Sequence, residues 1–73
     1  MKNYGEALKY QRELNGYSQN DLAKKTGITQ AAISYWESNK KRPNIEVCEL
    51  LADLYGISID ELIGREGYIP SKQ

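Results

Sequence analysis

The 73-residue sequence predicts an all-α fold, a compact bundle of five helices. Its apolar residues recur at intervals of three and four positions, which is the helical spacing, and no stretch sustains the alternation typical of a strand. Short polar residues and glycines divide the chain at points suited to helix starts and stops. Together these signals place the predicted helices at residues 4–15, 19–26, 30–37, 45–55 and 59–63.

Each predicted helix begins at a polar side chain that can cap free backbone N–H groups. Three of these caps stand three residues before an acid, as in a capping box: Asn3 before Glu6, Ser18 before Asp21 and Ser58 before Glu61. The third and fourth helices follow Thr29 and Asn44, which lack such an acid. Glycine tolerates the left-handed conformation that ends many helices, and four glycines stand at such ends: Gly16, Gly27, Gly56 and Gly64.

The predicted core follows from the helical spacing of the apolar residues. Around the second and third helices we expect burial of Leu22, Ala23, Ile28, Ile33 and Trp36. The fourth helix carries one continuous stripe, at Cys48, Leu51, Ala52 and Tyr55. Apolar residues at the joins between elements complete it: Ile45, Ile57 and Leu62. Trp36 as a stacking platform and Cys48 as a reactive thiol are the alternatives, but positions on buried stripes favour core roles.

The composition excludes several classes of function. With no His and one Cys, the chain lacks the residues for a Cys/His zinc site, a Ser-His-Asp relay or an internal disulfide. It also lacks a glycine-rich phosphate loop, so we expect no enzyme activity, no metal and no cofactor. No signal peptide or membrane-spanning run is visible, and no small-molecule ligand is evident. These features predict a cytoplasmic protein with no membrane partner.

The charge of the chain is zero overall but strongly polarised. Residues 1–43 hold eight Lys and Arg against four Asp and Glu, a net of +4, whereas residues 44–73 hold two against six, a net of −4. Such asymmetry between halves is typical of proteins that bind nucleic acid or of a polarised interface. We expect residues 1–64 to form one domain and residues 65–73 an irregular tail.

The second and third predicted helices are joined by Thr26-Gly27-Ile28-Thr29, a short glycine-containing turn of the kind found in a helix-turn-helix. The run Arg12-x3-Gly16-x-Ser18-Gln19-x2-Leu22-Ala23-x3-Gly27-Ile28-Thr29-x3-Ile33-Ser34-x2-Glu37 resembles the Cro/phage-repressor (XRE-type) helix-turn-helix family. Pro43 and the run Leu51-Ala52-x2-Tyr55-Gly56-Ile57-Ser58-x-Asp60-x-Leu62-Ile63 extend the resemblance to roughly residues 4–64. It implies a lambda-repressor-like DNA-binding domain that recognises operator DNA, usually as a repressor.

The outward face of the third helix is the candidate base-reading surface. This face carries no charge, although solvated helix faces are usually rich in Lys and Glu. It consists of Gln30, Ala31, Ser34 and Tyr35. Gln can bond adenine in a bidentate way, and Ala can contact a thymine methyl group. The resemblance independently implies that the family's base-reading positions fall on Gln30, Ala31 and Tyr35, with Ser34 nearby. The alternative is an ordinary polar surface helix.

The candidate phosphate contacts flank that helix. Ser18 and Gln19 open the second helix, where free N–H groups favour an anion, and Thr29 caps the third. The loop that follows the third helix offers an amide and three cations, Asn39, Lys40, Lys41 and Arg42, and the alternative is a merely solvated loop.

The resemblance adds two implications about single residues. It assigns a phosphate contact to Gln19 and a structural ion pair to Arg12 and Glu37. Gln11 stands where the family commonly has Leu, and we expect Leu8 and Leu14 to compensate in the first helix.

A second surface is predicted in the acidic half of the chain. Apolar side chains remain there once the inner stripe of the fourth helix is complete: Val47, Leu50, Leu54, Ile59 and Ile63. They predict a homodimer interface, to which Tyr68 and Ile69 could add, and two-fold dimers suit half-sites one helical turn apart. The alternative is that the tail of the same chain covers this flank.

These features together predict a sequence-specific double-stranded DNA-binding regulator, a small dimeric repressor of the phage or mobile-element type. The alternative is a protein-interaction module of the same fold, an antitoxin or adaptor with weak or no specific DNA binding. The operator sequence, the choice between repression and activation, and the way in which binding to DNA is relieved stay open.

Overall fold

The computed structural model of the protein describes residues 3–64, which form five helices. They are α1 (Tyr4–Leu14), α2 (Gln19–Thr26), α3 (Gln30–Glu37), α4 (Ile45–Tyr55) and α5 (Ile59–Ile63). No strand occurs within these residues, so the all-α prediction is confirmed, with helix bounds within one residue of those expected. The predicted tail, including Tyr68 and Ile69, lies outside the described residues.

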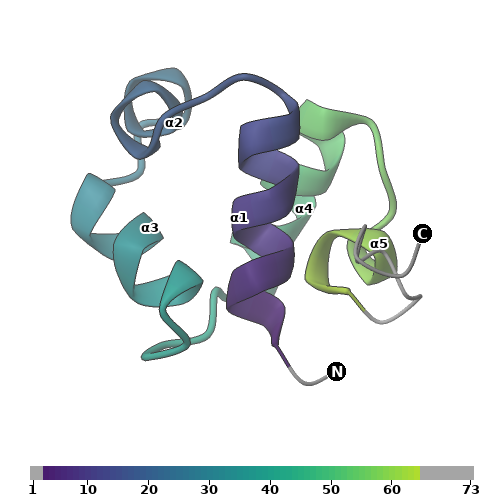
Figure 1. Ribbon diagram of the computed structural model, residues 1–73. Coiled ribbons are helices and arrows are strands. Elements are labelled where there is room, and N and C mark those ends of the chain that lie inside the picture. Colours follow the sequence, from purple (N-terminus) through teal and green to yellow (C-terminus); the bar gives the residue numbers. More distant parts are fainter. Residues whose placement is uncertain (1–2, 65–73) are drawn as a thin grey trace.

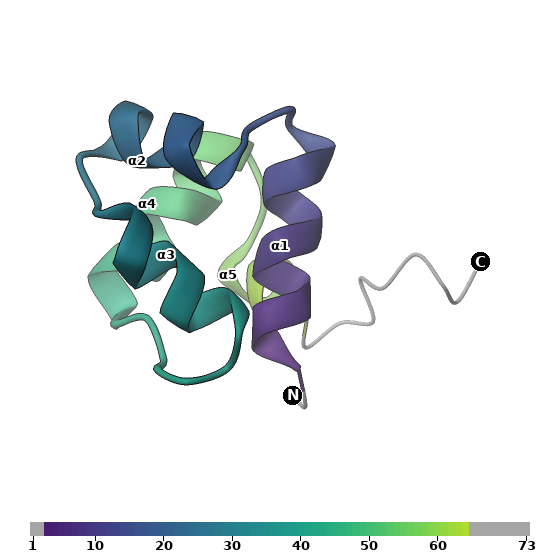
Figure 2. The same cartoon turned by 60° about the vertical axis from the view of Figure 1, so that its left-hand side comes forward.

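Helix α1 is the central element of the bundle. It packs against α3 on one side and against α5 on the other, while α2 lies against α3 and α4 against α5 (Figure 1). A second view shows α2 and α3 together at one side of α1 (Figure 2). The arrangement leaves α3 at the edge of the molecule, with one face available to a partner.

All five helices start at the polar caps that the sequence predicts. In each case the side-chain oxygen accepts a hydrogen bond from a backbone N–H in the first turn, as at Asn3, Ser18, Thr29, Asn44 and Ser58. The full capping box is present at Ser18, where the Asp21 carboxylate also accepts from the Ser18 N–H at 3.1 Å. Each cap of this kind contributes about 1 kcal/mol, which matters in a domain this small.

The core is a cluster of side chains from every helix. It consists of Leu8, Leu22, Ile33, Trp36, Cys48, Leu51, Ala52 and Leu62. Burial raises the pKa of the Cys48 thiol, because the thiolate is the form that loses hydration, so Cys48 behaves as a small core residue.

Two expectations about apolar residues are wrong. Leu14 does not compensate for Gln11, because its side chain stands at the solvated end of α1 and is 64% exposed. Ile45 opens α4 with 63% exposure and does not fill a join. Gln11 is itself buried, with 3% of its surface exposed. Its backbone carbonyl accepts a 2.7 Å hydrogen bond from the Asn15 side chain at the end of the helix.

Candidate nucleic-acid interface

Helix α3 separates a buried face from an exposed one. Ile33 and Trp36 point into the core, with 2% and 9% of their surface exposed. The four predicted base-reading side chains, Gln30, Ala31, Ser34 and Tyr35, are all exposed. The structure therefore brings them together on one uncharged face, and their contact with bases stays a prediction.

The turn before α3 fixes the direction in which that face points. Gly27 ends α2 in the left-handed conformation, with φ of 80°. The Thr26 hydroxyl donates to the Leu22 carbonyl at 2.8 Å and accepts from the Ile28 N–H at 3.2 Å. These bonds make the turn rigid, so α2 and α3 form one unit.

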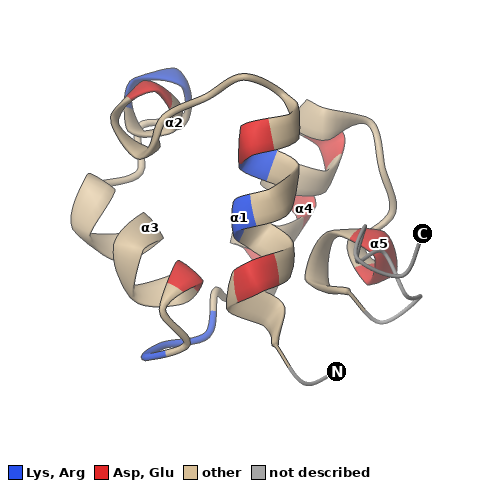
Figure 3. Ribbon diagram, viewed as in Figure 1, with Lys and Arg blue, Asp and Glu red and all other residues tan. Residues whose placement is uncertain are grey.

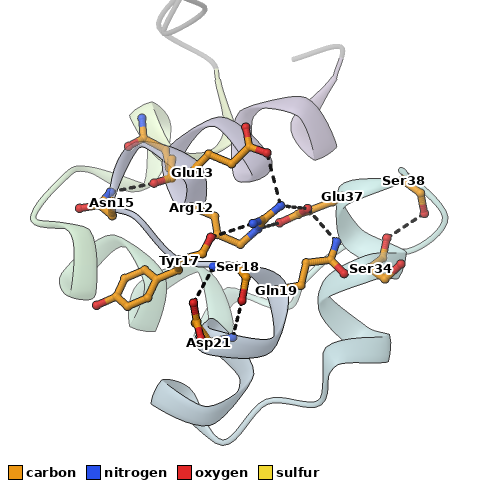
Figure 4. A network of polar contacts seen from close by, with 11 residues as sticks. Arg12, Glu13, Asn15, Tyr17, Ser18, Gln19, Asp21, Ser34, Glu37 and Ser38 are labelled. Atoms are coloured by element: carbon orange, nitrogen blue, oxygen red, sulfur yellow. Dashed lines mark hydrogen bonds and ion pairs between the residues drawn. The ribbon is translucent and has the colours of Figure 1, made fainter.

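An ion pair between α1 and α3 lies beneath this unit. The Arg12 guanidinium donates through Nε to Glu37 Oε2 at 2.7 Å and through Nη2 to Glu37 Oε1 at 2.9 Å (Figure 4). Both side chains are less than one-tenth exposed. Arg12 also donates to the Tyr17 carbonyl at 2.8 Å, and its hydrogen bonds to Glu37 raise its pKa.

Helix α2 joins the same network through Gln19. The Gln19 side-chain amide donates to Glu37 Oε1 at 3.0 Å, which directs the side chain across the start of α2 toward α3 (Figure 4). One N–H of that amide is occupied by this bond, and the other is available to a second acceptor. Ser18 at the cap is exposed, but its hydroxyl already accepts from the Asp21 N–H at 2.9 Å.

The pKa of Asp21 is lowered by hydrogen bonds from the Ser18 backbone and side chain, so the capping carboxylate stays charged. A negative charge at this point interacts favourably with the positive end of the α2 helix dipole but repels an incoming phosphate.

The basic loop, Lys40-Lys41-Arg42, follows α3, and its three side chains are exposed. Its backbone is held by α3, because the Tyr35 carbonyl accepts from the Lys40 N–H at 2.9 Å and from the Lys41 N–H at 3.4 Å. It is held by α1 as well, since the Tyr4 hydroxyl donates to the Lys41 carbonyl at 2.9 Å. Figure 3 shows the blue loop just after the end of α3 that carries its acidic residue, while the rest of α3 is tan and uncharged. Three exposed cations thus lie next to the candidate base-reading face.

Asn39 has a structural task that the sequence analysis missed. It adopts a left-handed φ of 64°, its Oδ1 accepts from the Gly5 N–H at 3.0 Å, and its Nδ2 donates to Asn3 Oδ1 at 3.0 Å. These bonds tie the loop to the first turn of α1. Its contact with a phosphate stays a prediction.

Two hollows flank the exposed face of α3. The loop-side hollow, of about 420 Å³, is lined by Thr29, Ala31, Ala32, Tyr35, Trp36, Lys41, Arg42 and Asn44. The α1-side hollow, of about 330 Å³, is lined by Lys9, Arg12, Gln19, Ser34, Glu37 and Ser38. With 3.6 residues per turn, their α3 residues fall on opposite edges of the same exposed face.

The predicted dimer surface is only partly exposed. Val47, Leu54, Ile59 and Ile63 are half-buried and pack against the core of their own chain, whereas Leu50 is 43% exposed. Much of this apolar surface is therefore accounted for within the monomer, and the dimer interface stays a prediction.

A rigid pair of helices with an exposed second helix, flanked by cations, defines the class of helix-turn-helix DNA-binding domains. A model of the helix-turn-helix family matches residues 8–62, and the chain belongs to this family. The resemblance to the Cro/phage-repressor type is thus confirmed, and with it a DNA-binding, transcription-regulating class. That class is not a class of enzymes.

Several relatives are HTH-type regulators by name. The transcriptional activator BcrR of Enterococcus faecalis is 33% identical over 66 residues, which is 90% of this chain and 32% of that protein. Putative transcriptional regulatory proteins of Saccharolobus islandicus (strain L.S.2.15 / Lassen #1) and Saccharolobus solfataricus are 41% identical over 64 residues, covering 88% of this chain and 19% of theirs. The chain thus spans a third or less of the length of these relatives.

Within residues 3–64, every helix is too short or too polar to cross a membrane.

Proposed function

We propose that the protein is a sequence-specific double-stranded DNA-binding regulator that reads the major groove with α3. The observation that carries this proposal is the uncharged exposed face of α3 beside three exposed cations in a loop with a fixed backbone. A helix of this size fits the major groove, where each base pair presents a distinct pattern of donors, acceptors and methyl groups. The basic loop would position the domain on the phosphates without reading sequence.

The proposed roles divide among three sets of residues. Gln30, Ala31 and Ser34 read base edges. Tyr35 reads a base, or its hydroxyl reaches a phosphate of the DNA backbone near Lys41. Gln19, Thr29 and the basic loop contact phosphates, with Ser18 at the start of α2. Arg12 and Glu37 hold α1 against α3, so that the reading face keeps its orientation.

We further propose that the protein binds as a two-fold dimer and represses by occupying its operator. Two copies would place their α3 helices in successive major grooves, roughly 34–36 Å apart. Repression requires occupancy of the site alone, whereas activation requires an additional contact with polymerase. A reporter gene placed behind the selected operator tests the sign, and increased expression would contradict repression.

The first experiment measures binding after selection of a preferred duplex from random DNA. Gln30→Ala should weaken binding to the preferred sequence by about 1–3 kcal/mol and relax preference at one base position. Lys41→Ala should weaken binding to all sequences alike and lower the salt dependence by about one phosphate contact.

Lys24→Ala is the matched control for charge, because Lys24 is an exposed lysine in the last turn of α2 and lines neither hollow. It should change neither the preference nor the salt dependence. If no sequence binds better than random DNA, the proposal fails, and a protein-interaction module of the same fold becomes the better description.

A further inference from the structure

The α1-side hollow is a surface to which the predicted DNA contacts assign no cation. Six residues from α1, α2 and the α3 region line it, and of its two cations Lys9 is the one to which no role has been assigned. The hollow borders the exposed face of α3 at Ser34, on the edge opposite the basic loop. This position makes the hollow part of any surface that a ligand of α3 would cover.

The charges within this hollow leave one cation uncompensated. Arg12 and Glu37 are paired with each other at 2.7 Å, so together they contribute no net charge. Lys9 is exposed, and no ion pair within residues 3–64 includes it. The hollow therefore carries a net charge of about +1, located at the flexible ammonium group of Lys9.

Hydrogen-bond donors surround the same space. The Gln19 amide is held at 3.0 Å from Glu37 Oε1 and has its second N–H available. Ser34 adds an exposed hydroxyl. A cation, an amide and a hydroxyl together favour an oxyanion with several acceptor oxygens, such as a phosphate diester.

The shape of the site favours a phosphate that is part of a duplex. The hollow is open, and a single exposed ammonium in water attracts a free anion weakly. A duplex that receives α3 in its major groove would bring a sugar-phosphate backbone along each edge of that helix. The two hollows lie on these two edges.

We propose that Lys9 contacts a backbone phosphate in the α1-side hollow, on the strand opposite to the one contacted by Lys41. This inference rests on the proposed function, because it requires α3 to enter the major groove. Gln19, positioned by Glu37, orients the phosphate, and Lys9 supplies the charge. The protein would thus hold both strands, one on each edge of α3.

The experiment combines protein variants with DNA in which single phosphates are replaced by neutral methylphosphonates. Duplexes of the selected sequence carry one replacement each, on either strand, and dissociation constants are measured for the wild type, Lys9→Ala, Lys41→Ala and Lys24→Ala. Lys9→Ala should weaken binding on the order of fivefold to tenfold at 0.1 M salt, and lower the salt slope by about 0.9 for each protomer. The control Lys24→Ala should match the wild type.

The coupling between variant and phosphate is the decisive measurement. One methylphosphonate should weaken the wild type but leave Lys9→Ala unaffected, and a methylphosphonate on the other strand should do the same for Lys41→Ala. Lys9→Gln, which keeps most of the length of the side chain but not its charge, should behave like Lys9→Ala. Thermal unfolding of each variant separates a loss of contact from a loss of fold.

Three outcomes would overturn the inference. Lys9→Ala could couple to no phosphate, Lys9 and Lys41 could couple to the same strand, or inorganic phosphate at millimolar concentration could compete at Lys9 as well as DNA does. If the wild type binds no duplex selectively, the proposed function itself has failed. Selective binding by the wild type with an inert Lys9 refutes the Lys9 contact alone.

Discussion

Gly5 lies where the first turn of α1 crosses the end of α3. A Cβ atom built at this position would collide with the Glu37 carbonyl oxygen and would approach the Trp36 carbonyl oxygen to 2.8 Å. Both obstacles are backbone atoms, so neither can rotate aside. The close approach also lets the Gly5 N–H reach Asn39, which fixes the loop that carries the cations.

We predict that Gly5→Ala destabilises the protein by about 1–3 kcal/mol, the usual effect of overpacking. Helix propensity alone predicts the opposite sign, a gain of about 1 kcal/mol. Urea unfolding decides between them, and a variant more stable than the wild type would show that the two helices can separate without loss.

Tyr55 presents a buried hydroxyl that has no hydrogen-bond partner among the described residues. Burial raises the pKa of Tyr55 to about 12 from its ordinary value of 10.0. The folded state therefore keeps the proton that the unfolded chain releases above pH 10. The contribution of Tyr55 to the free energy of unfolding is fully present below pH 10 and is lost as the pH rises toward 12.

We predict that Tyr55→Phe leaves the free energy of unfolding unchanged or raises it by up to about 1 kcal/mol, since it removes an unsatisfied polar group. The variant should also lose the part of the alkaline destabilisation between pH 10 and 12 that belongs to Tyr55. Unfolding curves at pH 7, 10 and 11.5 measure both effects. Tyr17→Phe, on the neighbouring ring at 6.4 Å, serves as the control.

At the scale of the helices, the Arg12–Glu37 pair determines how α1, α2 and α3 meet. The pair is nearly buried, and Glu37 also holds Gln19, so removal of one partner affects three elements at once. A charge left alone in such a place is far more costly than the loss of an exposed ion pair.

We predict that Glu37→Gln lowers the free energy of unfolding by about 3–5 kcal/mol. The double variant Arg12→Met/Glu37→Met should be more stable than Glu37→Gln, because it leaves no buried charge. Glu13→Gln is the control, since Glu13 is 58% exposed and lies 3.9 Å from the same arginine, and it should change stability by less than about 0.5 kcal/mol. Equal effects of Glu13→Gln and Glu37→Gln would contradict this account.

The elements themselves were predictable because local chemistry determines them. Caps such as Ser18 and stops such as Gly27 act through hydrogen bonds within a few residues, and the structure places both as expected. What the sequence alone did not reveal depends on contacts between distant segments. The bonds from Tyr4 to Lys41 and from Gly5 to Asn39 join residues more than thirty positions apart, and no spacing rule reports them.

Misjudged burial has a similar cause. The sequence predicts that Leu14 compensates for Gln11, but its side chain at the last turn of α1 is 64% exposed. The α1-side hollow likewise arises where three helices meet, and only a three-dimensional arrangement brings Lys9 next to Gln19.

Across the whole molecule, the charge polarity separates the candidate DNA surface from the acidic α4 and α5. Figure 3 shows the cations of the basic loop next to α3 and acidic positions on α4 and α5. The molecule measures 31 × 23 × 20 Å along its principal axes. That size exceeds the Debye length of about 8 Å at physiological salt, but it is comparable with about 30 Å at 0.01 M.

We predict that neutralising the exposed acids of α4, with Glu46→Gln, Glu49→Gln and Asp53→Asn together, strengthens binding to random DNA at 0.01 M salt and has little effect at 0.15 M. The ratio of specific to random affinity should fall at low salt only. Titrations at both salt concentrations test this, and an equal effect at both would mean that α4 itself touches DNA.

The anchoring of the basic loop to the start of α1 also bears on how the domain can be divided. Asn3, Tyr4 and Gly5 hold Asn39 and Lys41, so the conformation of the loop depends on residues that precede the helix-turn-helix in the chain. A transplant of residues 19–42 into another scaffold would carry the reading helix and its cations but would leave their support behind. The smallest portable unit of recognition in this protein therefore begins at the first turn of α1.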